Sequence, residues 1–188
     1  ILQVRHIPER YVERHEQEWP LARTQWTKLY LDIDGLALSP TPLATGSSVR
    51  YDPSGEGLTF WTAPLTREME ITGPMAARLH VASESQDADL FVVVRVFDPE
   101  GKEVTFQGAL DPNTPISQGW LRASHRRLDE TESEPYRPYH PHDAVEPLTP
   151  GDVYPLDIEI WPSCIVIPTG YRLGFSVRGN DYRYEGEL

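Results

Sequence analysis

The segment GWLRASHRRLD, residues 119–129, holds a serine, a histidine and an aspartate close together. Ser124, His125 and Asp129 are the residue types of a serine hydrolase triad, in which the imidazole accepts the hydroxyl proton. The alternation of residues 120–125 predicts an extended strand, whose successive side chains point to opposite faces. Ser124 and His125 therefore cannot make the short contact that activates a nucleophile. We predict no catalytic residue here, and expect Asp129 to pair with a cation or cap a turn.

Arginines make the same segment the most basic stretch of an acidic chain. Arg122, Arg126 and Arg127 stand together, whereas the whole chain carries 17 Lys and Arg against 29 Asp and Glu. One interpretation is a solvated strand face. The other is a docking surface for an acidic partner or a neighbouring domain, because Trp and Arg are enriched at interfaces. The candidates for such an interdomain or pocket-rim surface are Trp120, Arg122, His125 and Arg126.

Charge, hydropathy and cysteine content exclude several classes of protein. A formal net charge of −12 provides no electrostatic footprint for nucleic acid or an anionic membrane. No apolar run reaches the length of about 18 residues that a transmembrane helix needs. The single cysteine, Cys164, excludes an internal disulfide framework and a cysteine-based zinc cluster. Its apolar neighbours in WPSCIVIP favour a buried, inert thiol.

The segment YHPHD, residues 139–143, is a candidate metal site. On a strand, His140 and His142 would lie on one face, and Asp143 follows directly. No further His or Cys ligand is indicated nearby in the sequence, and short matches of this kind often arise by chance. We favour a surface loop over a metal site.

Two acidic and glycine-containing segments suggest calcium. DGLALSP and DPSGEG contain Asp34, Asp52 and Glu56, but neither has the spacing of an EF-hand loop. Asp-Gly and Asp-Pro are ordinary turn sequences, so we expect turns. The sequence therefore predicts no metal and no cofactor.

The tryptophans allow one further function, which is carbohydrate binding. They could line a sugar-binding groove, although we expect at least three of them to fill the core or an interface. A carbohydrate-binding module is therefore kept as an alternative. The residues are Trp19, Trp26, Trp61, Trp120 and Trp161.

The pattern of the whole chain predicts an all-β fold. Prolines (18) and glycines (13) punctuate short runs of alternating apolar residues, which indicate half-buried strands. Residues 90–98 are nearly continuous in apolar residues, as in a strand covered on both faces. Only residues 7–18 could form a short helix, or else an irregular lead-in. We therefore expect a jelly-roll β-sandwich. The alternating runs are residues 29–33, 75–82, 154–161 and 171–178.

A series of motifs in a fixed order resembles a known family. They are TAPL, EITGP, DADLFV, DPEG, GWLRASHRRLD, LTPGDVYPLDIEIWP and GYRLGFSVRGND, preceded by EWPLARTQWTKLYLD. Together they resemble the C-terminal domain of X-Pro dipeptidyl-peptidases and of their acyl-esterase relatives, the cocaine-esterase-like (CocE/NonD) serine hydrolases. The resemblance covers residues 4–186 and is specific because many separate motifs occur in order.

The resemblance implies a jelly roll of the galactose-binding-like type beside an α/β-hydrolase domain. In the family, that second domain carries a Ser-Asp-His triad and hydrolyses esters or peptide bonds after proline through an acyl-enzyme. The triad positions lie upstream of Ile1, and no G-x-S-x-G elbow occurs in this chain. No catalytic residue is therefore carried over. The resemblance implies a non-catalytic module that packs on the catalytic domain and shapes its active-site mouth.

The resemblance also suggests where domains begin and end. We expect residues 1–31 to be a lead-in from an absent α/β-hydrolase domain, and residues 32–188 to form the sandwich. The chain begins with Ile and stops without a closing strand signal, so we expect an excised segment, truncated before the family's last segment. An unpaired strand edge would favour aggregation or dimerisation. A further alternative is an interaction module that mediates homo-oligomerisation through the apolar interdomain face exposed by excision. The substrate of the parent enzyme stays open, and so does the compartment, although a cytoplasmic location is favoured.

Overall fold

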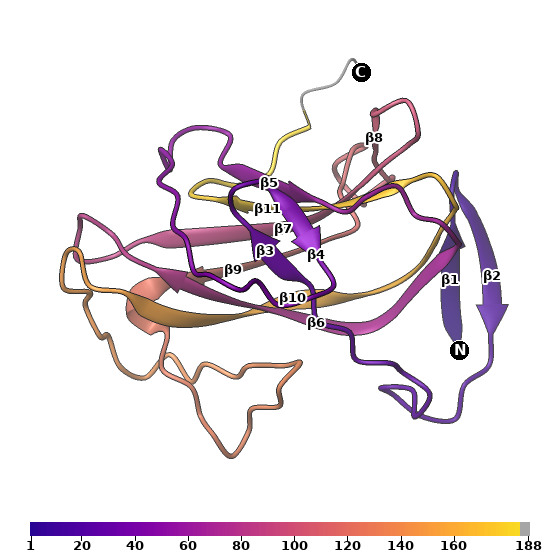
Figure 1. Cartoon of the computed structure of the whole chain (residues 1–188). Helices are drawn as coiled ribbons and strands as arrows, with labels where there is room; N and C mark the ends of the chain where they lie inside the picture. The colour runs from indigo at the N-terminus through magenta and orange to yellow at the C-terminus, as the bar shows by residue number, and fades with distance from the viewer. Residues whose placement is uncertain (185–188) are drawn as a thin grey trace.

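The computed structural model describes residues 1–184, which form two β-sheets packed face to face (Figure 1). The first sheet has the strand order β2-β1-β10-β6, in which β6 and β10 are the longest strands. These two strands pair antiparallel along their whole length, apart from one register shift. The strand bounds are β1 Leu2–His6, β2 Arg10–Arg14, β6 Met69–Val81 and β10 Tyr154–Ile167.

The second sheet has the order β3-β4-β5-β11-β7-β8, and β9 pairs with β7 beside β8. β7 and β11 form its centre, since each is hydrogen-bonded on both edges. β9 therefore forms the edge of this sheet next to the first half of β7. The bounds are β3 Tyr30–Asp32, β4 Ala37–Ser39, β5 Leu58–Trp61, β7 Asp89–Phe97, β8 Glu103–Val104, β9 Ser117–Arg122 and β11 Arg172–Arg178.

Apolar side chains at alternate positions of the strands fill the space between the two sheets. On β10, Leu156 and Ile158 are fully buried, whereas Trp161 on the opposite face is 62% exposed. On β7, adjacent Val92 and Val93 are both fully buried, so this strand is covered on both faces as expected. Burial of each such side chain contributes about 1.5–3 kcal/mol, which makes this layer the main source of stability. The expected all-β jelly-roll sandwich is confirmed.

The two sheets approach each other closely where β9 meets β10. A Cβ at Gly119 would lie 2.0 Å from the backbone oxygen of Glu159, so no larger residue fits there. The Ser117 hydroxyl donates a hydrogen bond to the carbonyl of Trp161 on the same stretch of β10. This contact fixes the edge strand that carries the surface described below.

The N-terminal segment differs from the expectation of a helix or an irregular lead-in within residues 7–18. β1 and β2 form an antiparallel hairpin, and β1 also pairs parallel with β10 through Arg5 and His6. Strand pairing with β10 outweighs the weak helix propensity of this segment. The hairpin is thus part of the first sheet, while the assignment of residues 1–31 to a lead-in from another domain stays a prediction.

Two further observations concern the whole chain. Residues 185–188, where the expected truncation of the sandwich falls, lie outside the described residues. Within residues 1–184 the one helical element is a 3₁₀ turn, Ala123–His125, so nothing described is long and apolar enough to cross a membrane as a helix.

Candidate docking surface

The exposed face of β9 presents an aromatic and a cationic side chain. Trp120 is 51% exposed, whereas Leu121 beside it is buried in the core. Trp161 projects next to Trp120 from β10, and the two ring centroids are 5.3 Å apart. The rings meet at 51°, so they do not form the flat platform on which a sugar ring would stack. With Arg122, which is also exposed, they form what we call the β9 surface: Trp120, Arg122 and Trp161.

The strand expected through Ser124 and His125 ends earlier, at Arg122, and a 3₁₀ turn follows (Figure 1). The turn directs Ser124 inward, where it is only 2% exposed. Asp87, just before β7, accepts hydrogen bonds from the Ser124 hydroxyl at 2.7 Å and from its backbone N–H at 2.9 Å. The Ser124 hydroxyl therefore donates to a structural carboxylate and not to His125.

The hydrogen bonds from Ser124 also set the protonation of Asp87. Partial burial raises the pKa of this carboxyl, but the bonds donated by Ser124 and Ala88 outweigh burial, so its pKa lies below the usual value. Asp87 is thus a charged acceptor that holds the 3₁₀ turn against the start of β7.

Arg126 anchors the chain after the turn. Its side chain is 17% exposed, and its guanidinium lies 4.5 Å from the ring centroid of Tyr154. It donates hydrogen bonds to the carbonyls of Ala123 and Glu146, and so joins the two ends of the long loop between β9 and β10. A guanidinium with several donors in a fixed fork suits this task.

The expected concentration of positive charge is neutralised by carboxylates from other segments. Arg122 pairs with Asp89 in two parallel hydrogen bonds of 2.8 and 3.0 Å, which raises the pKa of Arg122. Arg127 pairs with Asp143, whose pKa is lowered by the hydrogen bond from the guanidinium. Because Asp89 lies far from Arg122 in the sequence, composition near residue 122 could not reveal this pairing.

Three histidines gather at the end of β9. His125 and His142 face each other with their Nδ1 atoms 3.3 Å apart, and the His140 ring lies 6.0 Å from that of His142. The His140 nitrogens contact two backbone carbonyls, those of Arg127 and Asp157. Sequence reasoning missed His125 as a neighbour of the YHPHD segment, because the loop that brings them together has no periodic signal. No group of three or more His, Cys, Asp or Glu side chains in the described residues is arranged to hold a metal.

Two expected turns are confirmed. Asp129 caps a turn by accepting hydrogen bonds from the backbone N–H and hydroxyl of Thr131. Asp52 does the same with Ser54. Both carboxyls have lowered pKa values because of these hydrogen bonds.

The expectation of a buried Cys164 is wrong. This residue is partly buried, and its Sγ lies 3.4 Å from the Thr72 hydroxyl. The register shift between Ile160 and Ser163 reverses which side chains of β10 face the core, so Ile165 is buried and Cys164 lies on the other face.

Four of the five tryptophans are about half exposed, so the core does not hold three of them, and their placement in an interface stays a prediction. Trp61 packs its ring against Phe97, with centroids 4.2 Å apart. Trp26 stacks on Tyr136 but remains 53% exposed. The others, Trp19, Trp120 and Trp161, are also about half exposed.

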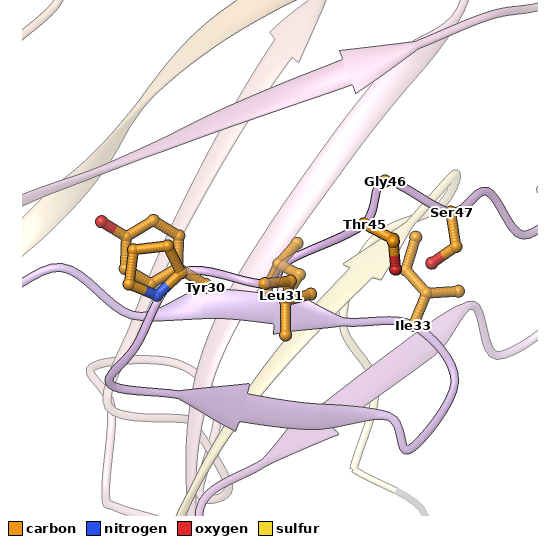
Figure 2. Close-up of a pocket in the computed structure, with 8 residues that line it drawn as sticks. Tyr30, Leu31, Ile33, Thr45, Gly46 and Ser47 are labelled. Carbon is orange, nitrogen blue, oxygen red and sulfur yellow. The ribbon is translucent and has the colours of Figure 1, made fainter.

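A shallow apolar pocket lies beside the edge strand β3 (Figure 2). Tyr30, Leu31 and Ile33 line one side of it, and the loop of residues 42–47 lines the other. Its lining contains hydroxyl groups but no acid–base pair. The pocket can accommodate an apolar group and offers no means of catalysis.

The comparisons with known proteins place the chain in one family. Residues 3–186 match the family described as the X-Pro dipeptidyl-peptidase C-terminal non-catalytic domain. The chain belongs to this family. The resemblance drawn from the motifs is therefore confirmed.

The relatives described next are much longer than this chain. A CocE/NonD family hydrolase from Staphylococcus aureus matches 98% of the chain with a TM-score of 0.90 and 27% identity, and the match covers 34% of that protein. Proteins named as serine esterases in Mycobacterium bovis and Mycobacterium tuberculosis are each 33% identical over 129 residues. Those alignments cover 66% of this chain but only 19% of either esterase.

Proposed function

We propose that this chain is the non-catalytic β-sandwich of a serine hydrolase of the X-Pro dipeptidyl-peptidase or acyl-esterase type. In this role it packs on an α/β-hydrolase domain of the same protein and helps to shape the mouth of the active site. The observation that carries the proposal is the match to a non-catalytic domain family over residues 3–186. The 98% coverage of the chain by a hydrolase three times its length supports the same arrangement.

The β9 surface is the proposed contact with the catalytic domain. Exposed Trp and Arg side chains are the types that dominate binding energy at interfaces. The close approach at Gly119 and the Ser117 hydrogen bond hold β9 against β10, the two strands that carry Trp120 and Trp161. His125 and Arg126 were predicted as part of the same surface. Arg126 contributes by fixing the loop behind it, and His125 lies at the rim.

The absence of catalysis in the isolated chain is tested with ester and X-Pro-nitroanilide substrates. We expect no turnover above that of buffer for the purified chain, because the Ser124 hydroxyl is committed to Asp87. Turnover that Ser124→Ala abolishes would overturn the proposal. Solution mass measured across concentration tests the predicted homo-oligomerisation in the same preparation.

The docking role is tested in the full-length parent enzyme. Arg122→Glu and Trp120→Ala are expected to lower kcat/KM or the thermal stability of the catalytic domain, because they alter the β9 surface. The matched control is Lys102→Glu, the same charge reversal at an exposed position beyond the opposite end of β7. Unchanged kinetics and unchanged unfolding in both β9 variants would remove the docking surface from the proposal while leaving the family assignment intact.

A further inference from the structure

We propose that His125 and His142 form a two-histidine site for a divalent transition metal such as Zn²⁺ or Cu²⁺. This inference rests on the geometry of the histidines alone and does not depend on the proposed docking function. It differs from the expectation of no metal, because the sequence does not show that His125 lies opposite His142.

The distance between the two imidazoles fits a shared metal ion. Their Nδ1 atoms lie 3.3 Å apart and face each other across the end of β9. Two nitrogens bound to one tetrahedral zinc ion at about 2.0–2.1 Å are separated by about 3.3 Å. The ring centroids are 5.3 Å apart and the rings are inclined by 47°, so the rings do not stack in parallel. A metal could therefore occupy the site without a large movement of either backbone.

Both histidines are positioned by the surrounding structure. His125 ends the 3₁₀ turn that Ser124 and Asp87 anchor. His142 has a positive φ of 54°, a conformation that few residues with a side chain adopt. Such backbone strain persists where the surroundings enforce it and is common at binding sites. The strained backbone sets the imidazole of His142 opposite that of His125.

Solvent completes the coordination shell. His142 is exposed and His125 is partly exposed, so water can reach the space beside both nitrogens. His140 is not a ligand, because both of its nitrogens contact backbone carbonyls. The nearest carboxylate in sequence, Asp143, is paired with Arg127. Two protein ligands with water in the remaining positions describe an exchangeable site and not a closed structural one.

The ligand chemistry selects the class of metal. Imidazole nitrogens suit zinc, copper and nickel, whereas calcium and magnesium require oxygen ligands. The Irving–Williams order places Cu²⁺ above Zn²⁺ and Ni²⁺ at such a site. Only the neutral imidazole binds a metal, so affinity falls as the solution is acidified. A bound ion would link the loop between β9 and β10 to the end of β9, beside the β9 surface.

The test is titration calorimetry of the untagged chain with Zn²⁺, Cu²⁺ and Ca²⁺. We expect one Zn²⁺ or Cu²⁺ per chain and no Ca²⁺ binding. His125→Gln and His142→Gln should each weaken zinc binding by about tenfold or more, because either change leaves a single imidazole ligand. The matched control is His80→Gln, which removes an exposed histidine on β6 and should leave binding unchanged. Circular dichroism shows that each variant is folded.

A second measurement identifies the atoms involved. The ¹⁵N resonances of Nδ1 in His125 and His142 should shift together as zinc is added, while those of His80 do not. Absence of saturable binding, or equal affinity in the wild type and both glutamine variants, would overturn the site. Equal loss of affinity in His80→Gln would also overturn it, since binding would then be unspecific.

Discussion

Two arginine–carboxylate pairs in this sandwich share one geometry but differ in burial. Arg95 on β7 binds Glu103 on β8 through two nitrogens, and their side chains are 19% and 8% exposed. Arg122 on β9 binds Asp89 on β7 in the same way, with 57% and 46% of the side chains exposed. The chemistry of the two pairs is equal, so any difference in their effect on stability comes from their surroundings.

The inner pair is the centre of a larger network. The Arg95 guanidinium also reaches the Ser176 hydroxyl on β11 at 3.3 Å, and Tyr182 donates a hydrogen bond of 2.9 Å to Glu103. Burial, followed by the negative charge of Glu103, raises the pKa of Tyr182 far above its ordinary value. The network therefore holds β7, β8, β11 and the segment after β11 together.

The outer pair connects only the neighbouring ends of β9 and β7. Both charges remain in water, where screening and side-chain entropy reduce the value of an ion pair. We therefore expect the Arg122–Asp89 pair to contribute little to stability, and the Arg95–Glu103 pair to contribute more.

Removing one member of the inner pair should have the largest effect. Glu103→Ala removes the carboxylate that accepts two hydrogen bonds from the Arg95 guanidinium and one from the Tyr182 hydroxyl. We expect a loss of about 3 kcal/mol in the free energy of unfolding, the lower end of the range for a buried pair because Arg95 keeps some contact with water. Urea denaturation provides the measurement. A loss below about 1 kcal/mol would mean that the inner pair behaves like a surface pair.

Loss of the Ser124–Asp87 hydrogen bond, which anchors the 3₁₀ turn, should have the second-largest effect on the free energy of unfolding. Ser124→Ala removes a buried hydrogen bond to a charged acceptor, for which we expect a cost of about 1.5–3 kcal/mol. The same urea experiment measures it, and Ser54→Ala serves as control because that serine caps an exposed turn through the same type of bond. Equal effects of the two changes would contradict the structural role of Ser124.

The pH dependence of stability should also report the contact between Asp87 and Ser124. The folded-state pKa of Asp87 lies below its unfolded value, so its contribution is complete above the unfolded pKa of about 3.9. That contribution is lost as the pH falls through the lower, folded pKa. Asp87→Asn should therefore flatten the decline of stability below about pH 4, measured by thermal unfolding between neutral and acid pH. An unchanged slope would show that Asp87 is not a stabilising charge.

The outer pair should contribute less to stability than the inner pair. A double-mutant cycle with Arg122→Ala and Asp89→Ala is expected to give a coupling free energy well below that of the Arg95–Glu103 pair, because both side chains lie in water. The coupling should shrink further at high salt, because the exposed charges are screened. A coupling as large as that between Arg95 and Glu103 would contradict the expected difference between the exposed and the buried pair.

Trp120→Ala should have the smallest effect on the isolated chain. The ring is half exposed and contacts mainly Trp161, so we expect a change within about 0.5 kcal/mol, as for ordinary surface positions. The parent enzyme should be affected more strongly than the isolated chain. Equal effects in both would place Trp120 in the fold and not in an interface.

Periodicity made much of the fold predictable. The alternation of Leu156, Ile158 and Ile160 with polar residues indicated both a strand and its buried face, and the burial of these residues is confirmed. The apolar neighbours of Cys164 predicted its burial wrongly, because the register shift after Ile160 reverses which side chains face the core. Alternation failed at Ser124, where a 3₁₀ turn replaces the expected strand. A bulge or a turn of a few residues leaves too little periodic signal to be recognised.

The candidate surface was predictable only in part. Its location on β9 followed from the clustering of Trp and Arg in one short segment. Its charge did not, since Asp89 and Asp143 neutralise Arg122 and Arg127 across the fold. The hairpin of β1 and β2 was missed for a related reason. Its strand state depends on pairing with β10, which lies more than a hundred residues away in sequence.

The sequence by itself determined the all-β class, the faces of the long strands and membership of the family, because these depend on local alternation and on ordered motifs. Only the tertiary structure decided that Arg126 is an anchor, that Ser124 binds Asp87, and that His125 meets His142. Each of these depends on loops that bring distant residues within a few ångströms. No local periodicity encodes such distances, so they emerge only when the two sheets have packed.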